Sequence, residues 1–467
     1  MEVTFIPKDA TLGTLKVVIA PEDYLPNVDK EAKKLASKAQ IKGFRTGKTP
    51  ISVIKNLYGN QIIAEETNQI FSKAINDYLS TNEIDYLGEP MPSETYQDEY
   101  NFDWRNPSAF TFHIDIATPS PFELSYENTT ATNYSIIFDD EALQETISNI
   151  QKNFSTRVEV ENSEADDVVS GSSTWTNEEG SVETFKTFIP TDKLKKDAQN
   201  QFVGLKVGDT LDFVPETLFE DNKEIRYMLG VFDEAKIAII AAQKLTLTIE
   251  KIERSIPSEL NEEFFSKVFP NEAIANEEQF KQRVKDINVE SLQLEANKFI
   301  FEVLKDKLVA AHQFDLPKDF LKKWLAYSNQ GKVSIEEIEK EYPKFEEDLR
   351  WVVLQRKIAK QENISVGKED VENRAIDLLA SQMKQYGIYT EENVASLPQL
   401  ARKMLAENKG KQYRDIENMI FGEKIQEVLF QKVPMQVENV TWKGLVEISE
   451  NYYKNKYKDT PIEMETI

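Results

Sequence analysis

Residues 43–50 read Gly-Phe-Arg-Thr-Gly-Lys-Thr-Pro. Apolar residues at helical spacing precede this stretch over residues 23–41 and resume directly after it, so the stretch connects two helices. Its two glycines can adopt positive φ at no steric cost, and its proline is suited to the start of the second helix. The sequence therefore predicts a hinged turn with Phe44 at its tip.

The same stretch contains Gly-Lys-Thr, which is part of the phosphate-binding P-loop motif. That motif has four residues between its glycines, whereas Gly43 and Gly47 enclose three. A P-loop also follows a buried strand, and this stretch follows a basic helix. Spacing and context therefore argue against nucleotide binding.

The side chains of the turn suggest a binding surface. An exposed phenylalanine beside cations is unfavourable unless a partner covers it. Arg45 and Lys48 suit phosphate, whereas Phe44 suits an apolar pocket or a stacked base. The alternative is that Phe44 folds back onto its own domain, and the residues alone leave both interpretations open.

Charge is unevenly distributed along the chain. The formal net charge is −25, which argues against a general nucleic-acid binder, because phosphate neutralisation supplies most of that affinity. Between Lys30 and Lys55, however, there are eight basic residues and one acidic residue, Glu31. Such a stretch can steer an acidic protein toward a polyanion, although a solvated, lysine-rich helix face is the simpler alternative.

Length and composition are typical of a globular protein of several domains. A chain of 467 residues is too long for one core, and about two to four domains are expected. No apolar run approaches the roughly 20 residues that span a bilayer, and no secretory signal is visible at the N-terminus. The absence of cysteine excludes thiol catalysis, disulfides and Fe–S clusters and is compatible with the reducing cytosol. We therefore expect a cytoplasmic protein with no membrane partner.

Periodicity divides the chain into regions of different class. Residues 1–115 read as a β-α-α-β domain that ends on the alternating strand 110–116, and residues 116–150 as a connector followed by a helix. Residues 151–253 are rich in short strands and turns, and residues 254–467 are helical and almost free of glycine. In the helical region, helices are expected at 277–313 and near 335–361, 368–385 and 412–432, and Ser334 with Glu337 three residues on forms a capping box before the second of them. The predicted fold class is multidomain α+β.

The histidines and carboxylates of the sequence do not form a pattern typical of a catalytic site. His113 and His312 are far apart in sequence, without ligand spacing around either, so each is interpreted as structural. The many carboxylates lie on predicted helix faces and are interpreted as solvated. We predict no catalytic residue, no cofactor and no metal site.

Taken together, these stretches resemble the bacterial trigger factor family. Its ribosome-binding domain carries the signature Gly-Phe-Arg-x-Gly-Lys-x-Pro, and all six fixed positions are present here. The resemblance implies that the ribosome-binding residues are Gly43, Phe44, Arg45, Gly47, Lys48 and Pro50. It continues through residues 54–59, 110–116, 121–124, 247–252, 255–264 and 312–321. The family often has a second basic residue where this chain has Thr46, which implies weaker or more salt-sensitive docking.

The resemblance implies an architecture and a function. The expected domains are an α/β ribosome-binding domain (1–115), the connector (116–150), a β-rich domain similar to FK506-binding proteins (151–253) and an all-α substrate-binding domain with arms (254–467). The expected partners are the large ribosomal subunit, through an exit-site protein and ribosomal RNA, and unfolded or nascent polypeptides. Off the ribosome a homodimer is an open expectation. The family also links the chain to protein transport and cell division.

The helical region would supply apolar contacts for clients. The candidate side chains are aromatic residues and methionines, which make adaptable contacts, and each could equally be ordinary core. They are Phe299, Trp324, Tyr327, Met383, Tyr386 and Met404.

The middle domain departs from the family pattern. Residues 203–209 match the family's glycine-containing turn, but the Ile-Pro-Gly-Phe segment upstream falls on residues 195–198, Lys-Lys-Asp-Ala. The Asp-Phe-x-Gly element is also replaced near residues 167–171, and an insertion that includes residues 226–242 precedes the last strand. We expect a weak or inactive isomerase. The alternatives are an active peptidyl-prolyl isomerase and a holdase or scaffold that is independent of ribosomes.

Overall fold

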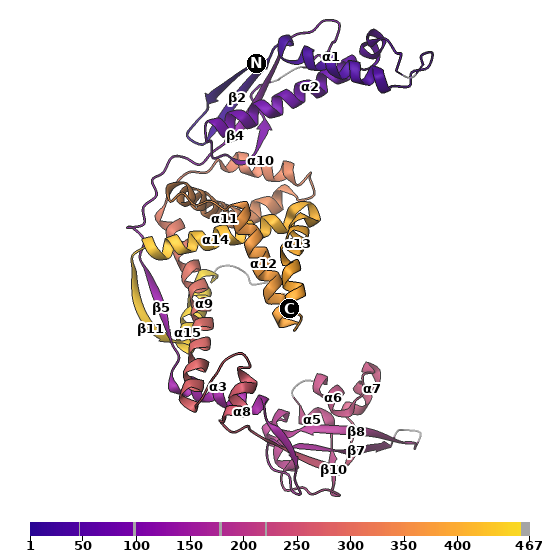
Figure 1. The fold of residues 1–467 in the computed structure, drawn as a ribbon, viewed down its shortest axis with the longest axis vertical. Coiled ribbons are helices and arrows are strands. Elements are labelled where there is room, and N and C mark those ends of the chain that lie inside the picture. The colour runs from indigo at the N-terminus through magenta and orange to yellow at the C-terminus, as the bar shows by residue number, and fades with distance from the viewer. Residues whose placement is uncertain (46, 97–99, 177–179, 220–221, 459–467) are drawn as a thin grey trace. The chain divides into compact units, whose positions relative to one another are not determined.

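The structure is a computed structural model that describes residues 1–467 except 46, 97–99, 177–179, 220–221 and 459–467 (Figure 1). Contacts divide the chain into two compact units, and each unit is assembled from two separate stretches. The first unit comprises residues 1–133 and 298–437, and the second comprises residues 134–297 and 438–467.

The first unit begins with a four-stranded antiparallel sheet and two helices. The sheet order is β1-β2-β4-β3. The elements are β1 (Glu2–Pro7), β2 (Leu12–Ile19), α1 (Pro21–Lys38), α2 (Ile51–Thr81), β3 (Leu87–Pro92) and β4 (Phe110–Ala117). The predicted helices and the strand at 110–116 are confirmed, whereas β3 was not predicted. Two prolines and a glycine in β3 obscure its strand signal.

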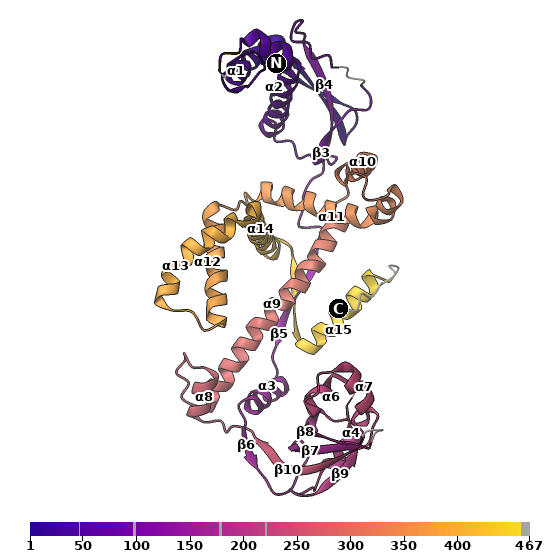
Figure 2. The same ribbon diagram turned by 90° about the vertical axis from the view of Figure 1, so that its right-hand side faces the viewer.

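The core of this domain lies between the sheet and the helix pair α1–α2 (Figure 2). Alternate residues of β2, namely Leu15, Val17 and Ile19, are fully buried, as strand periodicity requires. Tyr24 of α1 and Ile63 of α2 are buried in the same cluster. The helix pair therefore presents one face to the sheet and leaves the connecting turn at its end.

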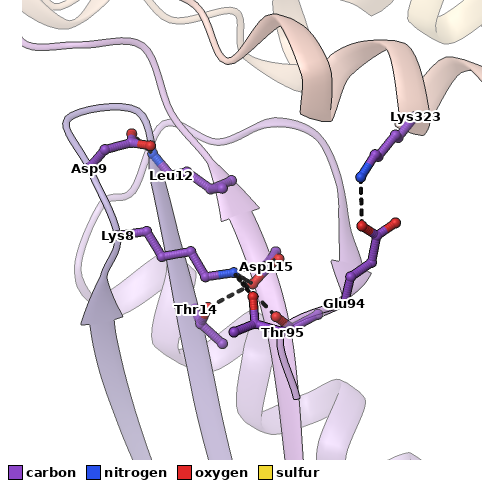
Figure 3. A network of polar contacts seen from close by, with 9 residues as sticks. Lys8, Asp9, Leu12, Thr14, Glu94, Thr95, Asp115 and Lys323 are labelled. Carbon is purple, nitrogen blue, oxygen red and sulfur yellow. Dashed lines mark hydrogen bonds and ion pairs between the residues drawn. The ribbon is translucent and has the colours of Figure 1, made fainter. Parts of the chain in front are cut away.

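A polar network holds the edge of the sheet near β3 (Figure 3). The Lys8 ammonium donates to both oxygens of the Asp115 carboxylate, at 2.8 and 2.9 Å, and the Thr14 hydroxyl donates to the same carboxylate at 2.6 Å. In the segment after β3, Glu94 pairs with Lys323 of α10 (Lys318–Ser328) at 2.6 Å. That hydrogen bond raises the pKa of Lys323.

The remainder of the first unit is largely helical. Its elements are the C-terminal part of α9 (Glu277–Ala311), α10, α11 (Ile335–Gln361), α12 (Lys368–Gln385), α13 (Glu391–Ala406), η3 (Glu407–Gly410) and α14 (Lys411–Lys432). The side chain of Ser334 caps α11 and its partner Glu337 completes the capping box, as the sequence predicts. Helices α12, α13 and α14 share a small core.

Among the described residues after β10 (Leu245–Ile256), helices dominate but one strand is also present, so the expectation of an all-α domain needs correction. Strand β11 (Met435–Thr441) pairs with β5 (Ala131–Ile137) of the connector in a two-stranded sheet. Valines at positions 437 and 440 favour an extended backbone there, and the connector supplies the strand that satisfies it. Helix α9 and both strands continue from one unit into the other.

Contacts with the end of α9 and with the loop that follows it hold the connector. The Phe122 ring stacks on Phe314 with centroids 4.4 Å apart. The buried His312 accepts a hydrogen bond from the Ser125 amide at Nε2 (3.0 Å), while its Nδ1 lies 2.8 Å from the Leu308 carbonyl oxygen and donates to it. Both ring nitrogens are therefore used structurally.

The second unit contains a five-stranded sheet of order β6-β10-β7-β8, with β9 paired to β10. Its elements are α3 (Asp140–Asn153), β6 (Thr156–Glu159), β7 (Val168–Thr176), β8 (Val182–Pro190), η1 (Thr191–Lys193), α4 (Lys196–Gln199), η2 (Asn200–Phe202), β9 (Thr210–Phe213), α5 (Pro215–Leu218), α6 (Asn222–Leu229), α7 (Glu234–Ala241), β10 (Leu245–Ile256), α8 (Glu262–Val268), the first part of α9, and α15 (Trp442–Lys456). A Cβ at Gly171 would lie 2.0 Å from the Thr248 carbonyl oxygen, so the close approach of β7 and β10 requires glycine there.

Candidate functional site

Two backbone hydrogen bonds between residues three positions apart stabilise the turn between α1 and α2. The Phe44 amide donates to the Ile41 carbonyl oxygen at 3.0 Å, and the Lys48 amide donates to the Arg45 carbonyl oxygen at 2.9 Å. Both glycines of the turn have positive φ, 95° at Gly43 and 77° at Gly47. A residue with a side chain would be strained at either position, so the glycines define the path of the turn.

Phe44 lies outside the domain core. Its side chain is 41 % exposed, and Arg45 and Lys48 on either side of it are also exposed. The alternative that Phe44 folds back into its own domain is therefore not favoured. Thr46, at the position where the family often has a second basic residue, lies outside the described residues.

Pro50 ends the turn and provides the N-cap of α2. Its carbonyl oxygen accepts from the Val53 amide at 3.0 Å, which begins the helix as the sequence predicts. Thr49 beside it is buried and anchors the turn to the domain. The turn is thus fixed at its C-terminal end while its tip projects into solvent.

The basic stretch is partly paired. Lys55 forms an ion pair with Asp29 across the two helices, and Lys34 pairs with Glu31 at 3.1 Å. The other six basic side chains of the stretch have no carboxylate within 4 Å among the described residues; they are Lys30, Lys33, Lys38, Lys42, Arg45 and Lys48. All six are exposed. They form an excess of positive charge on an acidic chain.

The first two turns of α2 add exposed apolar side chains that the sequence did not single out for binding. Of the apolar residues at helical spacing, Ile54 is fully buried, whereas Ile51, Leu57 and Tyr58 are exposed. The spacing correctly predicts the helix but does not reveal which residues face the core. The surface beside the turn is therefore both basic and apolar.

In the middle domain, the segment in the place of Ile-Pro-Gly-Phe packs into the domain itself. Lys195 is the N-cap of the short helix α4, which contains residues 196–198, and Ala198 is buried in the same cluster as Leu194 and Phe202. The Lys195 ammonium donates to the Glu216 carbonyl oxygen at 3.3 Å. This segment presents a charged surface outward and small apolar contacts inward.

The insertion of the middle domain completes its core. Helices α6 and α7 contribute Ile225, Met228, Ile237 and Ile240 to the same buried cluster as the sheet residues Leu247 and Ile249. Side chains of the insertion thus lie against the sheet.

An ion pair also stabilises the middle domain. The Asp167 carboxylate, only 1 % exposed, accepts from the Arg254 Nε and from an Arg254 terminal nitrogen, both at 2.9 Å.

The candidate client-binding side chains differ in how far they are exposed. Phe299 is buried in the core, and Trp324 is half-buried and packs on Gly88, where a Cβ would lie 2.8 Å from the Trp324 ring. Tyr327 and Tyr386 are well exposed. The remaining two, Met383 and Met404, are half-buried.

Apolar side chains gather near the connection between α12 and α13. Tyr386, Ile388 and Tyr389 lie in that connection and are exposed, and Leu378 and Leu400 are exposed on the two helices. The sequence signalled Tyr386 but not its neighbours, because the connection carries no regular periodicity.

Among the residues that the structure describes, no group of three or more histidine or acidic side chains is placed to hold a metal ion. Within the described part of the chain, no helix is long and apolar enough to cross a membrane. His113 stacks on Tyr96 with centroids 3.9 Å apart.

Comparison with known proteins accounts for nearly the whole chain. Residues 1–150 match the family model of "Bacterial trigger factor protein (TF)", residues 157–257 that of "Probable trigger factor, FKBP-like domain", and residues 296–448 that of "Probable trigger factor, C-terminal domain". The chain belongs to the trigger factor family. It is therefore a ribosome-associated chaperone that binds nascent chains and assists protein folding, and its middle domain is FKBP-like.

Relatives in this family are distant in sequence but similar in extent. The trigger factor of Chlorobaculum parvum is 24 % identical over 457 residues, covering 91 % of this chain and 95 % of the relative. The trigger factor of Campylobacter fetus is 26 % identical over 381 residues, covering 78 % and 81 %. A solved structure titled "Promiscuous Substrate Recognition in Folding and Assembly Activities of the Trigger Factor Chaperone" is 19 % identical, with a TM-score of 0.49, and covers 93 % of this chain and 100 % of that chain.

Proposed function

We propose that the turn at residues 43–50 is the part of the chain that docks on the large ribosomal subunit beside the peptide exit. The observation that carries this proposal is an exposed Phe44 between the exposed cations Arg45 and Lys48, on a turn whose path two glycines define. Phe44 enters an apolar pocket of an exit-site protein, and the two cations contact phosphates of ribosomal RNA. Gly43, Gly47 and Pro50 hold the turn in place.

Cross-linking from single positions tests this division of contacts. Because the chain contains no cysteine, Lys48→Cys provides a unique attachment point for a photo-reactive linker. We expect Lys48→Cys to cross-link to ribosomal RNA, and a photo-reactive analogue in place of Phe44 to cross-link to a protein at the exit. Lys206→Cys, an exposed lysine of the middle domain, is the matched control. Equal cross-linking from positions 48 and 206 would contradict the proposal.

Clients are proposed to contact the apolar side chains near the connection between α12 and α13. Tyr386, Ile388 and Tyr389 offer exposed apolar area, which suits weak binding of many unfolded segments. Weak contacts release the client as it folds, whereas a tight site would trap it.

Off the ribosome, we propose that a homodimer covers part of this surface. Sedimentation velocity at rising protein concentration would detect the dimer.

The middle domain is proposed to be a weak or inactive isomerase. Segment 195–198 packs Ala198 inward where the family has an aromatic residue, and the insertion packs against the same core.

The proposed location of the protein is the cytoplasm, where ribosomes and a reducing environment are found, and cell fractionation tests this location.

A further inference from the structure

Residues 100–105 form a strip that packs on the sheet and on α2 of the N-terminal domain, and every second side chain of this strip is aromatic. Tyr100 stacks on Phe112 with centroids 4.6 Å apart, and Phe102 lies 4.9 Å from Phe110, both partners being on β4. Trp104, the third aromatic residue of the strip, packs on α2. The sheet and α2 thus hold the strip at three successive points.

The contact between Trp104 and α2 depends on Gly59. A Cβ at Gly59 would lie 2.6 Å from Cγ of Trp104, so the indole can lie against the helix backbone only where the helix has a glycine. The Asn60 side-chain oxygen also accepts from the Trp104 amide at 3.1 Å. The residue that follows Trp104 is therefore placed next to α2.

That residue is Arg105, and its guanidinium is held in a defined position. The Arg105 Cζ lies 5.6 Å from the centroid of the Trp104 ring, and a terminal nitrogen donates to the Asn56 side-chain oxygen at 3.1 Å. The side chain is exposed, and no carboxylate of the described residues lies within 4 Å of it. A guanidinium has five N–H donors, so most of them remain for a ligand.

Arg105 also lies near the docking turn. Asn56 follows Pro50 by six residues, which corresponds to about 9 Å along the axis of α2. We propose that Arg105 is a further phosphate-binding side chain of the ribosome-docking surface and contacts the backbone of ribosomal RNA. This inference rests on the docking proposal for residues 43–50. A planar, pre-positioned guanidinium suits bidentate phosphate binding, and on a chain of net charge −25 a cation beside the basic stretch complements a polyanion.

The test is a binding titration of the full-length chain against purified large ribosomal subunits at several salt concentrations. For Arg105→Gln we expect affinity to fall about three- to tenfold and the slope of log affinity against log salt to fall by about 1, as for one lost phosphate contact. Arg105→Lys keeps the charge but loses the fork, and should lie between the wild type and Arg105→Gln. Lys73→Gln, an exposed position far along α2, is the charge-matched control and should change little.

The outcomes separate this inference from the docking proposal. Failure of the wild type to bind large subunits, or retention of binding by Phe44→Ala with Arg45→Ala, overturns the docking proposal. If those variants behave as expected but Arg105→Gln matches Lys73→Gln, the role of Arg105 is wrong. An affinity loss with an unchanged salt slope also overturns it, because it would indicate a protein contact instead of a phosphate.

Discussion

Backbone conformation at two glycines controls how the docking turn presents its side chains. Gly43 and Gly47 both have positive φ, but their surroundings differ. A Cβ at Gly43 would meet open space, whereas one at Gly47 would lie 3.2 Å from the Ser37 carbonyl oxygen at the end of α1. Conformational strain acts at both positions, and steric pressure adds to it at Gly47.

Alanine substitutions should separate these two effects. We expect Gly43→Ala to cost about 1 kcal/mol of turn stability and Gly47→Ala more, with ribosome affinity reduced about fivefold or more. The matched control is Gly204→Ala in the middle domain, also at positive φ and open, which should leave ribosome affinity unchanged. Affinities measured by sedimentation would contradict this expectation if Gly43→Ala were the more damaging of the two turn variants.

A second residue-scale prediction concerns Tyr342 of α11. Its ring is buried beneath the ammonium groups of Lys318 and Lys322, 5.4 and 5.2 Å from the ring centroid, and its hydroxyl has no hydrogen-bond partner among the described residues. Tyr342→Phe keeps the ring and removes an unpaired polar atom. We expect the free energy of unfolding to be unchanged or to rise by up to about 1 kcal/mol at neutral pH, measured by urea denaturation.

The same residue predicts a pH dependence. Burial raises the pKa of Tyr342 to about 12, above its ordinary value of 10.0. The unfolded chain therefore loses this proton at a lower pH than the folded chain does. Its titration leaves the free energy of unfolding unchanged below pH 10 and lowers it as pH rises from 10 toward 12. Tyr342→Phe should lose less stability than the wild type between pH 10 and 11. Parallel curves for the two proteins would show that Tyr342 does not titrate in this way.

At the scale of elements, strong local signals predicted helices well and weak ones failed. Helix α11 begins and ends where its capping box and spacing indicate, and α12 also has its predicted bounds. Helix α13 was missed because it contains Pro398, which reads as a helix breaker. Strands β5 and β11 are short and depend on each other for pairing, so neither is evident from its own sequence.

The middle domain yields the element-scale prediction. Because α4, α6 and α7 contribute to one buried core with the sheet, we expect the full-length chain to accelerate isomerisation of a prolyl peptide at most weakly. A protease-coupled peptide assay at low protein concentration measures this, with an active FK506-binding protein as the reference. Acceleration comparable to that reference would contradict the prediction.

At the scale of the whole molecule, the sequence indicates regions but not how distant stretches combine. Each compact unit joins two stretches that are far apart in the chain. The turn at residues 43–50 was predictable because its residues are consecutive. The packing of Trp104 on Gly59 and the hydrogen bond of Arg105 to Asn56 were not predictable, because they depend on tertiary structure.

Client binding and ribosome docking should be separable in the intact chain. Tyr386→Ser with Ile388→Ser should weaken suppression of aggregation of a denatured client about two- to fivefold, because exposed apolar area is lost. Ribosome affinity should not change. The matched control is Tyr227→Ser with Phe232→Ser, two exposed aromatic residues of the middle domain. Equal loss in both double variants would argue against a preferred client surface between α12 and α13.

Co-sedimentation of the full-length chain with purified large ribosomal subunits tests docking through the turn most directly. We expect the wild type to sediment with the subunits and Phe44→Ala combined with Arg45→Ala to lose about tenfold or more in affinity, since an apolar anchor and a phosphate contact are removed together. Phe232→Ala combined with Lys206→Ala, exposed residues of the middle domain, should bind as the wild type does. Undiminished sedimentation of the Phe44 and Arg45 double variant would contradict docking through this turn.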